Sequence, residues 1–485
     1  MKAETNSKLT PRLPFGFQDN FAADILARSV MIEKICRVYE SFGFAPLETP
    51  AIEFVDNLGK YLPDSDQPDE GIFSFRDRDE QWLALRYDLT APLARVVAQY
   101  GNSLPIPYRR YQVGPVWRQE KPGPGRFRQF YQCDFDTVGS KSLAADAEVC
   151  AILCAVFEAL GFAAGSYVVR VNDRKILNGV LEQAGIGEPA RQRQVLRTID
   201  KLDRLGRGGV SELLQEGRKD QSGDYTKGAS LSASQVEIIL AFVGAGDPSR
   251  GRVISRLRDM VGTSAAGRQG VEELEKIDAL LDSTGLGPDK VRFDPSIVRG
   301  LEYYTGPVFE PEILDDSGSG ISFGSPAGGG RYDGLVQRFT GAEVPATGAS
   351  IGVDRLLAAM KALGKIKESS SSGPVIVTMM DASHLADYQK FVSEIRAAGI
   401  AAELYLGDKG FQAQLKYANK RQSPVVVIAG GDEFQRGEVT LKDMRLGAEL
   451  AKTIEKRDEW RKDQPAQTTV ARSDLVPAIR KILGE

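Results

Sequence analysis

The chain is 485 residues long, 42% of its residues are hydrophobic, 26% are charged, and its formal net charge is −4. This length exceeds what one ordinary hydrophobic core can organise, so we expect two to four domains. Acidic residues slightly outnumber basic ones, which excludes a nucleic-acid-binding protein whose surface is basic throughout. A nucleic-acid partner would have to bind local basic patches. Residues 1–10 are polar and no later run approaches the roughly 20 apolar residues of a membrane span, so we expect no membrane segment and a cytoplasmic location.

The histidine and cysteine content limits the chemistry that the protein can use. His384 is the single histidine, so a metal site of the HExxH kind is excluded, and a Ser-His-Asp triad would need this one residue. The four cysteines are scattered without a CxxC pair, which indicates neither a disulfide framework nor a zinc site. These counts favour a reaction that needs no protein imidazole.

The first predicted elements are a helix and a hairpin. Apolar residues at helical spacing predict a helix over about residues 21–42, and residues 71–90 are expected to form a hairpin with a charged turn. The hairpin ends at Asp88 and Thr90, and a carboxylate beside a hydroxyl can bind an ammonium group. The same two residues also fit a strand end followed by a helix cap, with Thr90 capping the helix that follows.

A second, longer hairpin is predicted over residues 109–136. Side chains alternate between apolar and polar on both arms, and the run KPGPG at 121–125 is a turn that cannot be helical. Guanidinium groups bind phosphate oxygens, and an aromatic ring can stack on a purine. On or beside the loop lie three arginines and two phenylalanines, Arg118, Arg126, Arg128, Phe127 and Phe130, together with the carboxylate of Glu120. The pattern indicates a nucleoside triphosphate bound on a sheet, and an edge hairpin with a solvated basic tip is the alternative.

The middle of the chain changes character. A helix is predicted over 146–161 and a strand over 167–172. From about residue 182 to residue 289 helix formers dominate, the breaks are rich in glycine, and there is no strand signal. We expect a separate helical insertion there, whose function the residues do not indicate.

Three short runs follow the insertion. VRGLEYYTGPVFE at 298–310 places an arginine before two tyrosines, AGGGRYDG at 327–334 is glycine-rich, and GASIGVDR at 348–355 runs into an apolar helix. An arginine that stays protonated can stabilise the charge of a phosphoryl reaction without proton transfer, and phenols can hydrogen-bond a ring nitrogen. The alternatives are a structural strand, a turn-rich loop and a surface arginine on a helix.

The C-terminal region is predicted to be a separate α/β unit. The run KESSSSG at 367–373 has the composition of a flexible linker. Beyond it, strands and helices alternate in a β-α-β-α-β order that predicts a parallel sheet, and the chain ends in a further helix.

Taken together, these motifs resemble those of the class II aminoacyl-tRNA synthetases, and specifically of the histidyl-tRNA synthetases. RQEKPGPGRFRQFYQCDFD at 118–136 resembles motif 2, FAPLETPAIE at 44–53 resembles the dimer-forming motif 1 around Pro50, and GASIGVDR resembles motif 3. The run at 298–310 resembles the histidine-specific motif. The resemblance implies an α+β catalytic domain built on an antiparallel sheet with helices, a helical insertion and a C-terminal α/β anticodon-binding domain. The implied catalytic domain comprises residues 1–181 and 291–366, the insertion 182–290, the linker 367–373 and the anticodon-binding domain 374–485.

The resemblance also implies a role for individual residues. Toward ATP, it implies Arg118 and Arg299 at the α-phosphate, Arg126 at the outer phosphates, Arg355 at the γ-phosphate, Glu120 beside adenine and Phe130 stacked on it. Toward histidine, it implies Asp88 and Thr90 at the α-amino group, Arg299 at the carboxylate, Gln132 at the amino acid, and Tyr303 and Tyr304 around the imidazole. Asp136 stands where many bacterial members carry glutamate, whose side chain is longer by one methylene group. The resemblance therefore implies that Asp136 contacts the imidazole with this shorter side chain or through a water molecule. No metal ligands can be assigned.

The implied activity is that of a histidine–tRNA ligase. Its partners would be ATP with Mg²⁺, histidine, tRNA(His) and a second copy of the chain in a homodimer. The alternative from another class is a non-catalytic regulatory paralogue of the kind that partners ATP phosphoribosyltransferase. That alternative expects the ATP-site arginines and the C-terminal unit to be lost, whereas Arg118, Arg299 and Arg355 are present.

Overall fold

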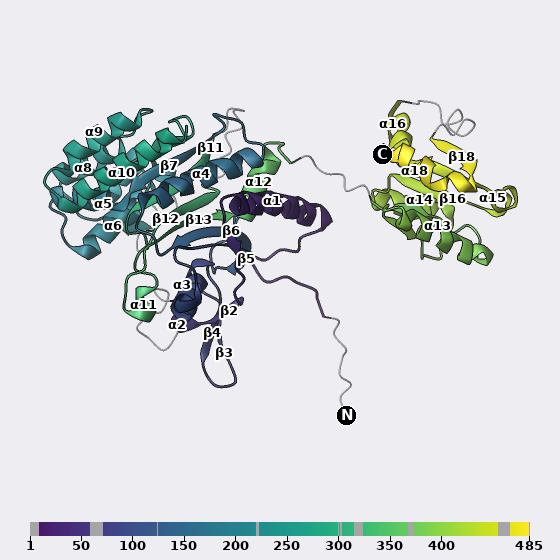
Figure 1. Ribbon diagram of the computed structural model, residues 1–485, viewed down its shortest axis with the longest axis horizontal. Helices are drawn as coiled ribbons and strands as arrows, with labels where there is room; N and C mark the ends of the chain where they lie inside the picture. Colours follow the sequence, from purple (N-terminus) through teal and green to yellow (C-terminus); the bar gives the residue numbers. More distant parts are fainter. Residues whose placement is uncertain are drawn as a thin grey trace. The chain divides into compact units, whose positions relative to one another are not determined.

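The computed structural model divides the chain into two compact units, residues 1–365 and 366–485, each of which is described by itself (Figure 1). The structure describes residues 9–58, 71–123, 125–219, 223–298, 300, 303–314, 324–366, 373–453 and 466–484. Within these ranges, none of the helices combines the length and the apolarity that crossing a bilayer requires.

The first unit is built on an eight-stranded sheet with the order β1-β5-β6-β13-β12-β11-β7-β10. The strands are β1 (Ala45–Pro46), β5 (Tyr108–Trp117), β6 (Gln129–Val138), β13 (Ala346–Gly352), β12 (Ala327–Arg331), β11 (Pro307–Ile313), β7 (Tyr167–Asp173) and β10 (Val291–Phe293). The interior pairs are antiparallel, and the two outermost pairs, β1 with β5 and β10 with β7, are parallel. The antiparallel sheet with helices is therefore confirmed, and it contains the hairpin predicted over 109–136 as β5 and β6.

Helices α1 (Ala22–Ser41), α4 (Leu143–Ala159) and α12 (Val353–Ala362) lie over one face of this sheet (Figure 1). The Tyr39 ring of α1 is buried against Phe135 of β6, with the ring centroids 4.9 Å apart, and the Tyr39 hydroxyl donates to the carbonyl of Cys133 at 3.2 Å. Because side chains alternate along a strand, the even-numbered residues of β6 point to the opposite face. That face carries the candidate site.

A three-stranded sheet lies beside the main one. Its order is β2-β4-β3, with strands β2 (Ile52–Phe54), β3 (Ser74–Arg76) and β4 (Trp82–Leu85). Strands β3 and β4 are the hairpin predicted over residues 71–90. The short helices near it are α2 (Val55–Leu58), α3 (Thr90–Tyr100), the 3₁₀ turn Gly101–Ser103 and α11 (Gln337–Thr340).

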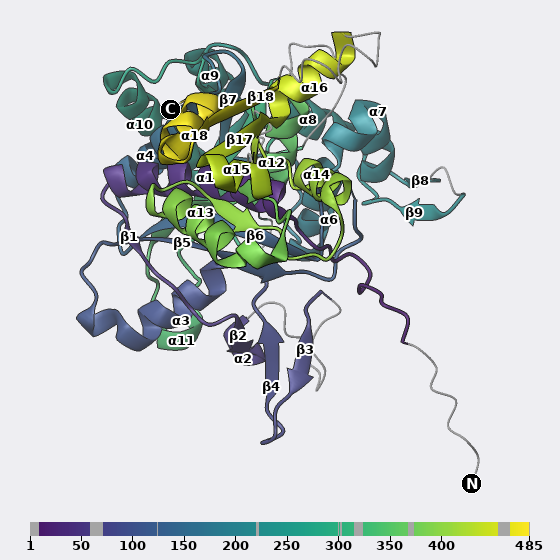
Figure 2. The ribbon, with the colours of Figure 1, turned by 90° about the vertical axis from the view of Figure 1, so that its right-hand side faces the viewer.

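The inserted segment packs as a helical layer that belongs to the same compact unit. Its helices are α6 (Pro189–Ile199), α7 (Leu202–Leu214), α8 (Ala233–Val243), α9 (Arg250–Val261) and α10 (Ala265–Ser283), and they pack with α5 (Arg174–Gln183), which precedes the insertion. The expectation of no strands was wrong, because β8 (Gly217–Lys219) and β9 (Tyr225–Lys227) form an antiparallel pair that Figure 2 shows extending from α7. Each of these strands has only three residues, mostly polar, too few to produce an apolar alternation.

The second unit is a five-stranded sheet with the order β15-β14-β16-β17-β18. Strands β14 (Val375–Val377), β15 (Ala402–Leu404) and β16 (Val425–Ile428) are parallel as predicted, whereas β17 (Glu438–Asp443) and β18 (Gln467–Ala471) pair antiparallel. The helices are α13 (Leu385–Ala397), α14 (Phe411–Lys420), α15 (Gly431–Arg436), α16 (Met444–Thr453) and α18 (Leu475–Leu483), with 3₁₀ turns at Ala382–His384 and Arg472–Asp474. Residues 367–372 of the predicted linker lie outside the described residues.

Candidate active site

A cavity of about 450 Å³ opens on the face of the main sheet that α1 leaves uncovered. Strands β6, β12 and β13, the start of α12 and the loop of the long hairpin contribute to its wall. Ten of the predicted site residues line it: Asp88, Thr90, Arg118, Glu120, Arg126, Phe130, Gln132, Tyr303, Tyr304 and Arg355. The fold thus brings together residues from the first hairpin, the second hairpin and the segments that follow the insertion.

Strand β6 supplies the floor of the cavity. Its side chains at Phe130, Gln132 and Asp134 follow the period of two and line the cavity. The Nε2 atom of Gln132 donates to the Ser350 hydroxyl of β13 at 2.6 Å. The floor is therefore fixed by both strand pairing and side-chain hydrogen bonds.

Arg118 lies at the end of β5 and is held on several sides. Its Nε donates to the carbonyl of Tyr87 at 3.1 Å, and its guanidinium lies 4.3 Å from the Tyr87 ring centroid and 5.2 Å from that of Phe130. Its Nη1 is 3.8 Å from a carboxylate oxygen of Glu120. A planar cation held in this way is preorganised to receive a phosphate group.

Two of the charged residues at the loop of the hairpin pair with each other. Arg126 and Glu120 form an ion pair, in which the Arg126 side chain is 53% exposed and that of Glu120 is 28% exposed. Both line the cavity at this end, so a nucleotide entering there would exchange this pair for its own contacts.

Arg355 enters the cavity from the first turn of α12. Its Nη1 donates to the carbonyl of Ser325 at 2.8 Å. The neighbouring Asp354 accepts a hydrogen bond from the backbone N–H of Tyr131 at 2.6 Å, which ties the start of α12 to β6. The positive end of the helix and the guanidinium together favour an anion at this point.

Asp88 and Thr90 stand where α3 begins, and both line the cavity. One carboxylate oxygen of Asp88 accepts the backbone N–H groups of Thr90 at 3.1 Å and of Ala91 at 2.8 Å. Asp88, and not Thr90, therefore caps α3. The capping role and a ligand-binding role are compatible, because a carboxylate can accept several hydrogen bonds.

Tyr303 and Tyr304 form the opposite wall, in a turn that precedes β11. Their rings meet edge to face with centroids 5.2 Å apart. Burial raises the pKa of both phenols well above the ordinary value, so both stay protonated and able to donate a hydrogen bond.

Asp134 is a cavity residue that the sequence did not single out. It is 1% exposed, and its Oδ1 has no hydrogen-bond partner among the described residues. Burial raises the pKa of this carboxyl to about 7, against the opposing effect of Arg110 and with a smaller raising effect of Asp136. The alternation that placed Gln132 and Asp136 on one face of β6 could have identified it.

Asp136 is not among the residues that line the cavity, and its expected approach to the imidazole stays a prediction. It is 3% exposed and forms an ion pair of 2.7 Å with Arg110, which is itself fully buried. The hydroxyl of Tyr332 donates to its other oxygen. Both oxygens of Asp136 are thus engaged, by Arg110 and by Tyr332, whereas Asp134, two residues earlier on the same face of β6, lines the cavity.

Arg299 lies outside the described residues, so its predicted place at the α-phosphate is not tested by this geometry. The adjacent Gly300 does line the cavity. Pro124 of the hairpin loop is likewise outside the described ranges.

Comparisons with known proteins identify the family of this chain. A family model described as histidyl-tRNA synthetase matches residues 16–356, and one described as an anticodon binding domain matches residues 374–482. A protein of Cereibacter sphaeroides named histidine–tRNA ligase is 57% identical over 483 residues, which cover 97% of each chain. One of the same name from Caulobacter vibrioides is 51% identical, over 99% of this chain and 98% of the relative.

Solved structures with a similar fold include members of the same family. A histidyl-tRNA synthetase from Nostoc sp. PCC 7120 superposes with a TM-score of 0.72 at 29% identity, over 98% of this chain and 100% of that chain. A Bacillus halodurans protein described as an ATP phosphoribosyltransferase regulatory subunit/histidyl-tRNA synthetase has a TM-score of 0.66 at 22% identity, over 84% of this chain and 97% of that chain, which shows the fold alone. The chain belongs to the histidyl-tRNA synthetase family.

Proposed function

We propose that the protein is a histidine–tRNA ligase. It activates histidine with ATP to give histidyl-adenylate and pyrophosphate, and then transfers histidine to the 3′ end of tRNA(His). The observation that carries the proposal is one cavity lined by Arg118 and Arg355 and also by Tyr303 and Asp134. Incubation of the purified protein with ATP, labelled histidine and tRNA(His) tests it, because labelled tRNA must accumulate.

At the nucleotide end, cationic groups fixed in advance receive the phosphates of a bent ATP. Arg118 contacts the α-phosphate, Arg126 the outer phosphates and Arg355 the γ-phosphate, and we retain Arg299 as a second group at the α-phosphate. Phe130 stacks on adenine beside Glu120. Attack of the histidine carboxylate on the α-phosphorus builds negative charge between two anions, and the guanidinium groups stabilise it without a proton transfer.

At the amino-acid end, Asp88 and Thr90 bind the ammonium group of histidine, with Gln132 beside it. Tyr303 and Tyr304 surround the imidazole. Asp134, which lines the cavity, accepts an imidazole N–H, and Asp136, two residues further along β6, acts on the ring through water. A site built to hydrogen-bond a ring nitrogen rejects analogues without one by roughly 10⁴-fold to 10⁵-fold.

Magnesium would enter with ATP, on its phosphate oxygens. Among the described residues there is no group of three or more His, Cys, Asp or Glu side chains placed to hold a metal. Mg²⁺ bound to phosphates needs only one or two protein carboxylates. Glu310 lines the cavity, with one oxygen 3.7 Å from Arg170, and is the carboxylate proposed for this role. The ion would neutralise charge on the outer phosphates.

The protein is proposed to act as a homodimer through motif 1. The apolar side chains Ile52, Phe54 and Tyr100 are 44%, 48% and 48% exposed, and they border a second hollow of about 630 Å³ to which Pro50 also contributes. Exposed apolar side chains gathered around one hollow support an interaction site there, and a second copy supplies the same surface.

The C-terminal unit is proposed to bind the anticodon of tRNA(His), and the enzyme to work in the cytoplasm. Its match to an anticodon binding domain supports the first point. The same match, together with Arg118 and Arg355 in the cavity, favours the ligase over the regulatory paralogue, which expects these features to be lost.

A further inference from the structure

Strand β12 and the residue after it hold the two tyrosines of the proposed histidine pocket from behind. The Tyr304 ring lies against Gly330, where a Cβ atom would be 2.7 Å from the ring, so only glycine leaves room for it. The Tyr332 ring stacks on Tyr303, with centroids 5.2 Å apart and an angle of 30° between the planes. Glycine and tyrosine thus fix the two rings from positions on either side of Arg331.

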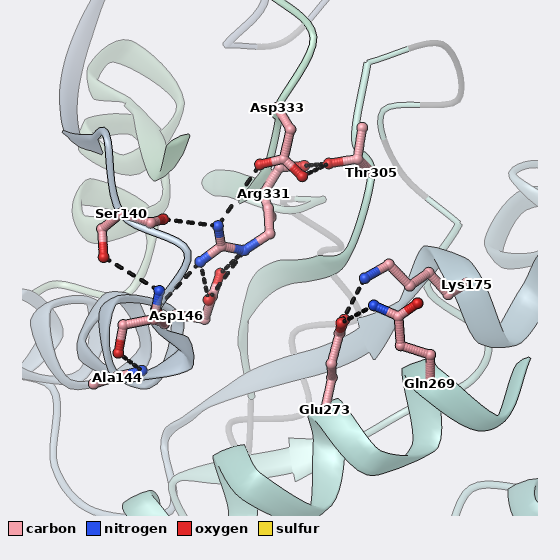
Figure 3. Close-up of polar contacts among 10 residues, drawn as sticks. Ser140, Ala144, Asp146, Lys175, Gln269, Glu273, Thr305, Arg331 and Asp333 are labelled. Carbon is pink, nitrogen blue, oxygen red and sulfur yellow. Dashed lines mark hydrogen bonds and ion pairs between the residues drawn. The ribbon is translucent and has the colours of Figure 1, made fainter. Parts of the chain in front are cut away.

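Arg331 fixes the residue that follows the tyrosines. Its backbone carbonyl accepts the N–H of Thr305 at 2.8 Å. The Thr305 hydroxyl donates to Asp333 at 2.8 Å, and the other oxygen of Asp333 lies 3.7 Å from Nη1 of Arg331 (Figure 3). Three consecutive residues of the chain, 330–332, therefore hold the consecutive residues 303–305.

The Arg331 side chain is itself anchored in the interior. Its Nε lies 3.2 Å from both carboxylate oxygens of Asp146 and its Nη2 lies 2.5 Å from one of them, while its Nη1 donates to the carbonyl of Ser140 at 3.0 Å (Figure 3). Arg331 is 5% exposed and Asp146 is fully buried. A bidentate pair of this kind has one geometry, and removing one charge leaves the other buried without its partner.

We infer that Arg331, held by Asp146, is a positioning residue for histidine. Arg331 does not line the cavity, so it acts through Tyr303, Tyr304 and Thr305 and not on the substrate itself. The inference rests on the proposed function, because it requires that the tyrosines contact the imidazole. It predicts an effect on histidine and none on ATP, whose proposed contacts lie on the hairpin and on α12.

The test compares Asp146→Asn with Asp278→Asn in the full-length protein. Asp278 forms a pair of 2.5 Å with Arg250, a buried arginine that also pairs with Asp282, and neither Asp278 nor Arg250 lines the cavity, so the second variant weakens the ion pairing of a buried arginine elsewhere. Calorimetric Kd for histidine, KM for histidine and for ATP in pyrophosphate exchange, and Tm are measured for both. Asp146→Asn should raise Kd and KM for histidine roughly 10-fold and leave KM for ATP within about two-fold. Asp278→Asn should lower Tm alone.

Two further variants separate the possible failures. Thr305→Val leaves the ion pair intact and should raise KM for histidine by about three-fold, which keeps the inference testable if Asp146→Asn does not fold. Tyr304→Ala removes a ring from the cavity wall and reports on the proposed pocket. If it raises Kd for histidine while Asp146→Asn and Thr305→Val do not, Arg331 is structural only and the inference is overturned. If Tyr304→Ala has no effect either, the proposed histidine pocket is overturned with it.

Discussion

The Nε of Arg118 donates to the backbone carbonyl of Tyr87 at 3.1 Å, and the ring of the same tyrosine lies 4.3 Å from the guanidinium carbon. One residue thus fixes both the plane and the direction of the arginine. Because Tyr87 directly precedes Asp88, the segment proposed to receive the ammonium group of histidine also orients the cation for the α-phosphate. In the proposed reaction, one continuous piece of chain therefore positions both substrates.

Replacing Arg118 tests this arrangement. Arg118→Lys keeps the charge and loses the planar fork, so kcat/KM for pyrophosphate exchange should fall roughly 10²-fold to 10³-fold. The binding of histidine without ATP should change little. Arg128→Lys is the matched control, because Arg128 lies on the same hairpin but does not line the cavity. An equal fall in kcat/KM for pyrophosphate exchange in Arg118→Lys and Arg128→Lys would contradict the role of Arg118.

A second prediction concerns Arg86, which is 4% exposed and joins motif 1 to β5. Its guanidinium donates to the carbonyls of Thr49 at 2.8 Å and Pro115 at 2.9 Å. A Cβ atom at Gly114 would lie 2.3 Å from Nη2 of Arg86, so Gly114→Ala must displace this group and lose hydrogen bonds. We expect the free energy of unfolding to fall by about 1–3 kcal/mol.

Gly101→Ala is the control for that measurement, because nothing lies within 4 Å of a Cβ atom placed there. Urea unfolding of the two alanine variants and the unchanged protein gives the comparison. A Gly114→Ala protein as stable as Gly101→Ala would show that the Arg86 contacts contribute nothing.

The pH dependence of histidine binding should report on Asp134. Its pKa is raised to about 7 in the folded protein, so the carboxyl is neutral below that pH and ionised above it. Histidine should therefore bind more tightly as the pH rises through 7, because only the carboxylate is a full acceptor for the imidazole N–H. The sign for stability is opposite: the burial of an ionised Asp134 destabilises the ligand-free fold increasingly between about pH 4 and pH 7.

Asp134→Asn should remove this step from a plot of Kd against pH. Free histidine titrates in the same range, and it does so identically with both proteins, so the difference between the two plots isolates Asp134. Identical plots would exclude Asp134 from the imidazole contact.

The proposed dimer surface can be tested by placing a charge on it. Ile52→Glu should convert a particle of twice the chain mass of 52.8 kDa into a monomer, because a buried charge without a partner opposes association. Ile238→Glu, at a residue of α8 that is 37% exposed, is the control and should stay dimeric. Light scattering after size exclusion distinguishes these outcomes, and a monomeric unchanged protein would refute the dimer.

Local patterns predicted much of this structure. The alternation of residues 127–135 located β6, and helical spacing located α1 within one residue at each end. The motif runs identified ten residues that line the cavity. The elements could be predicted because the periods of helix and strand are properties of short segments, whereas the ten residues were implied by the resemblance of whole motifs to a family.

What the sequence missed depends on contacts between distant segments. Asp136 is held by the hydroxyl of Tyr332, which lies 196 residues later in the chain, and no local pattern predicts that contact. Likewise, the antiparallel pairing of β17 depends on which strand lies beside it and not on its own residues. The alternative of Thr90 as the cap of α3 was wrong, because the carboxylate of Asp88 accepts the N–H groups of Thr90 and Ala91.

The most direct test of the central claim is ATP–pyrophosphate exchange with each of the twenty amino acids, run on the purified protein and on Arg118→Lys. We predict exchange with histidine alone, reduced at least roughly 10²-fold in the variant. No exchange with any amino acid, from folded protein that still binds histidine, would contradict the ligase and favour a regulatory role.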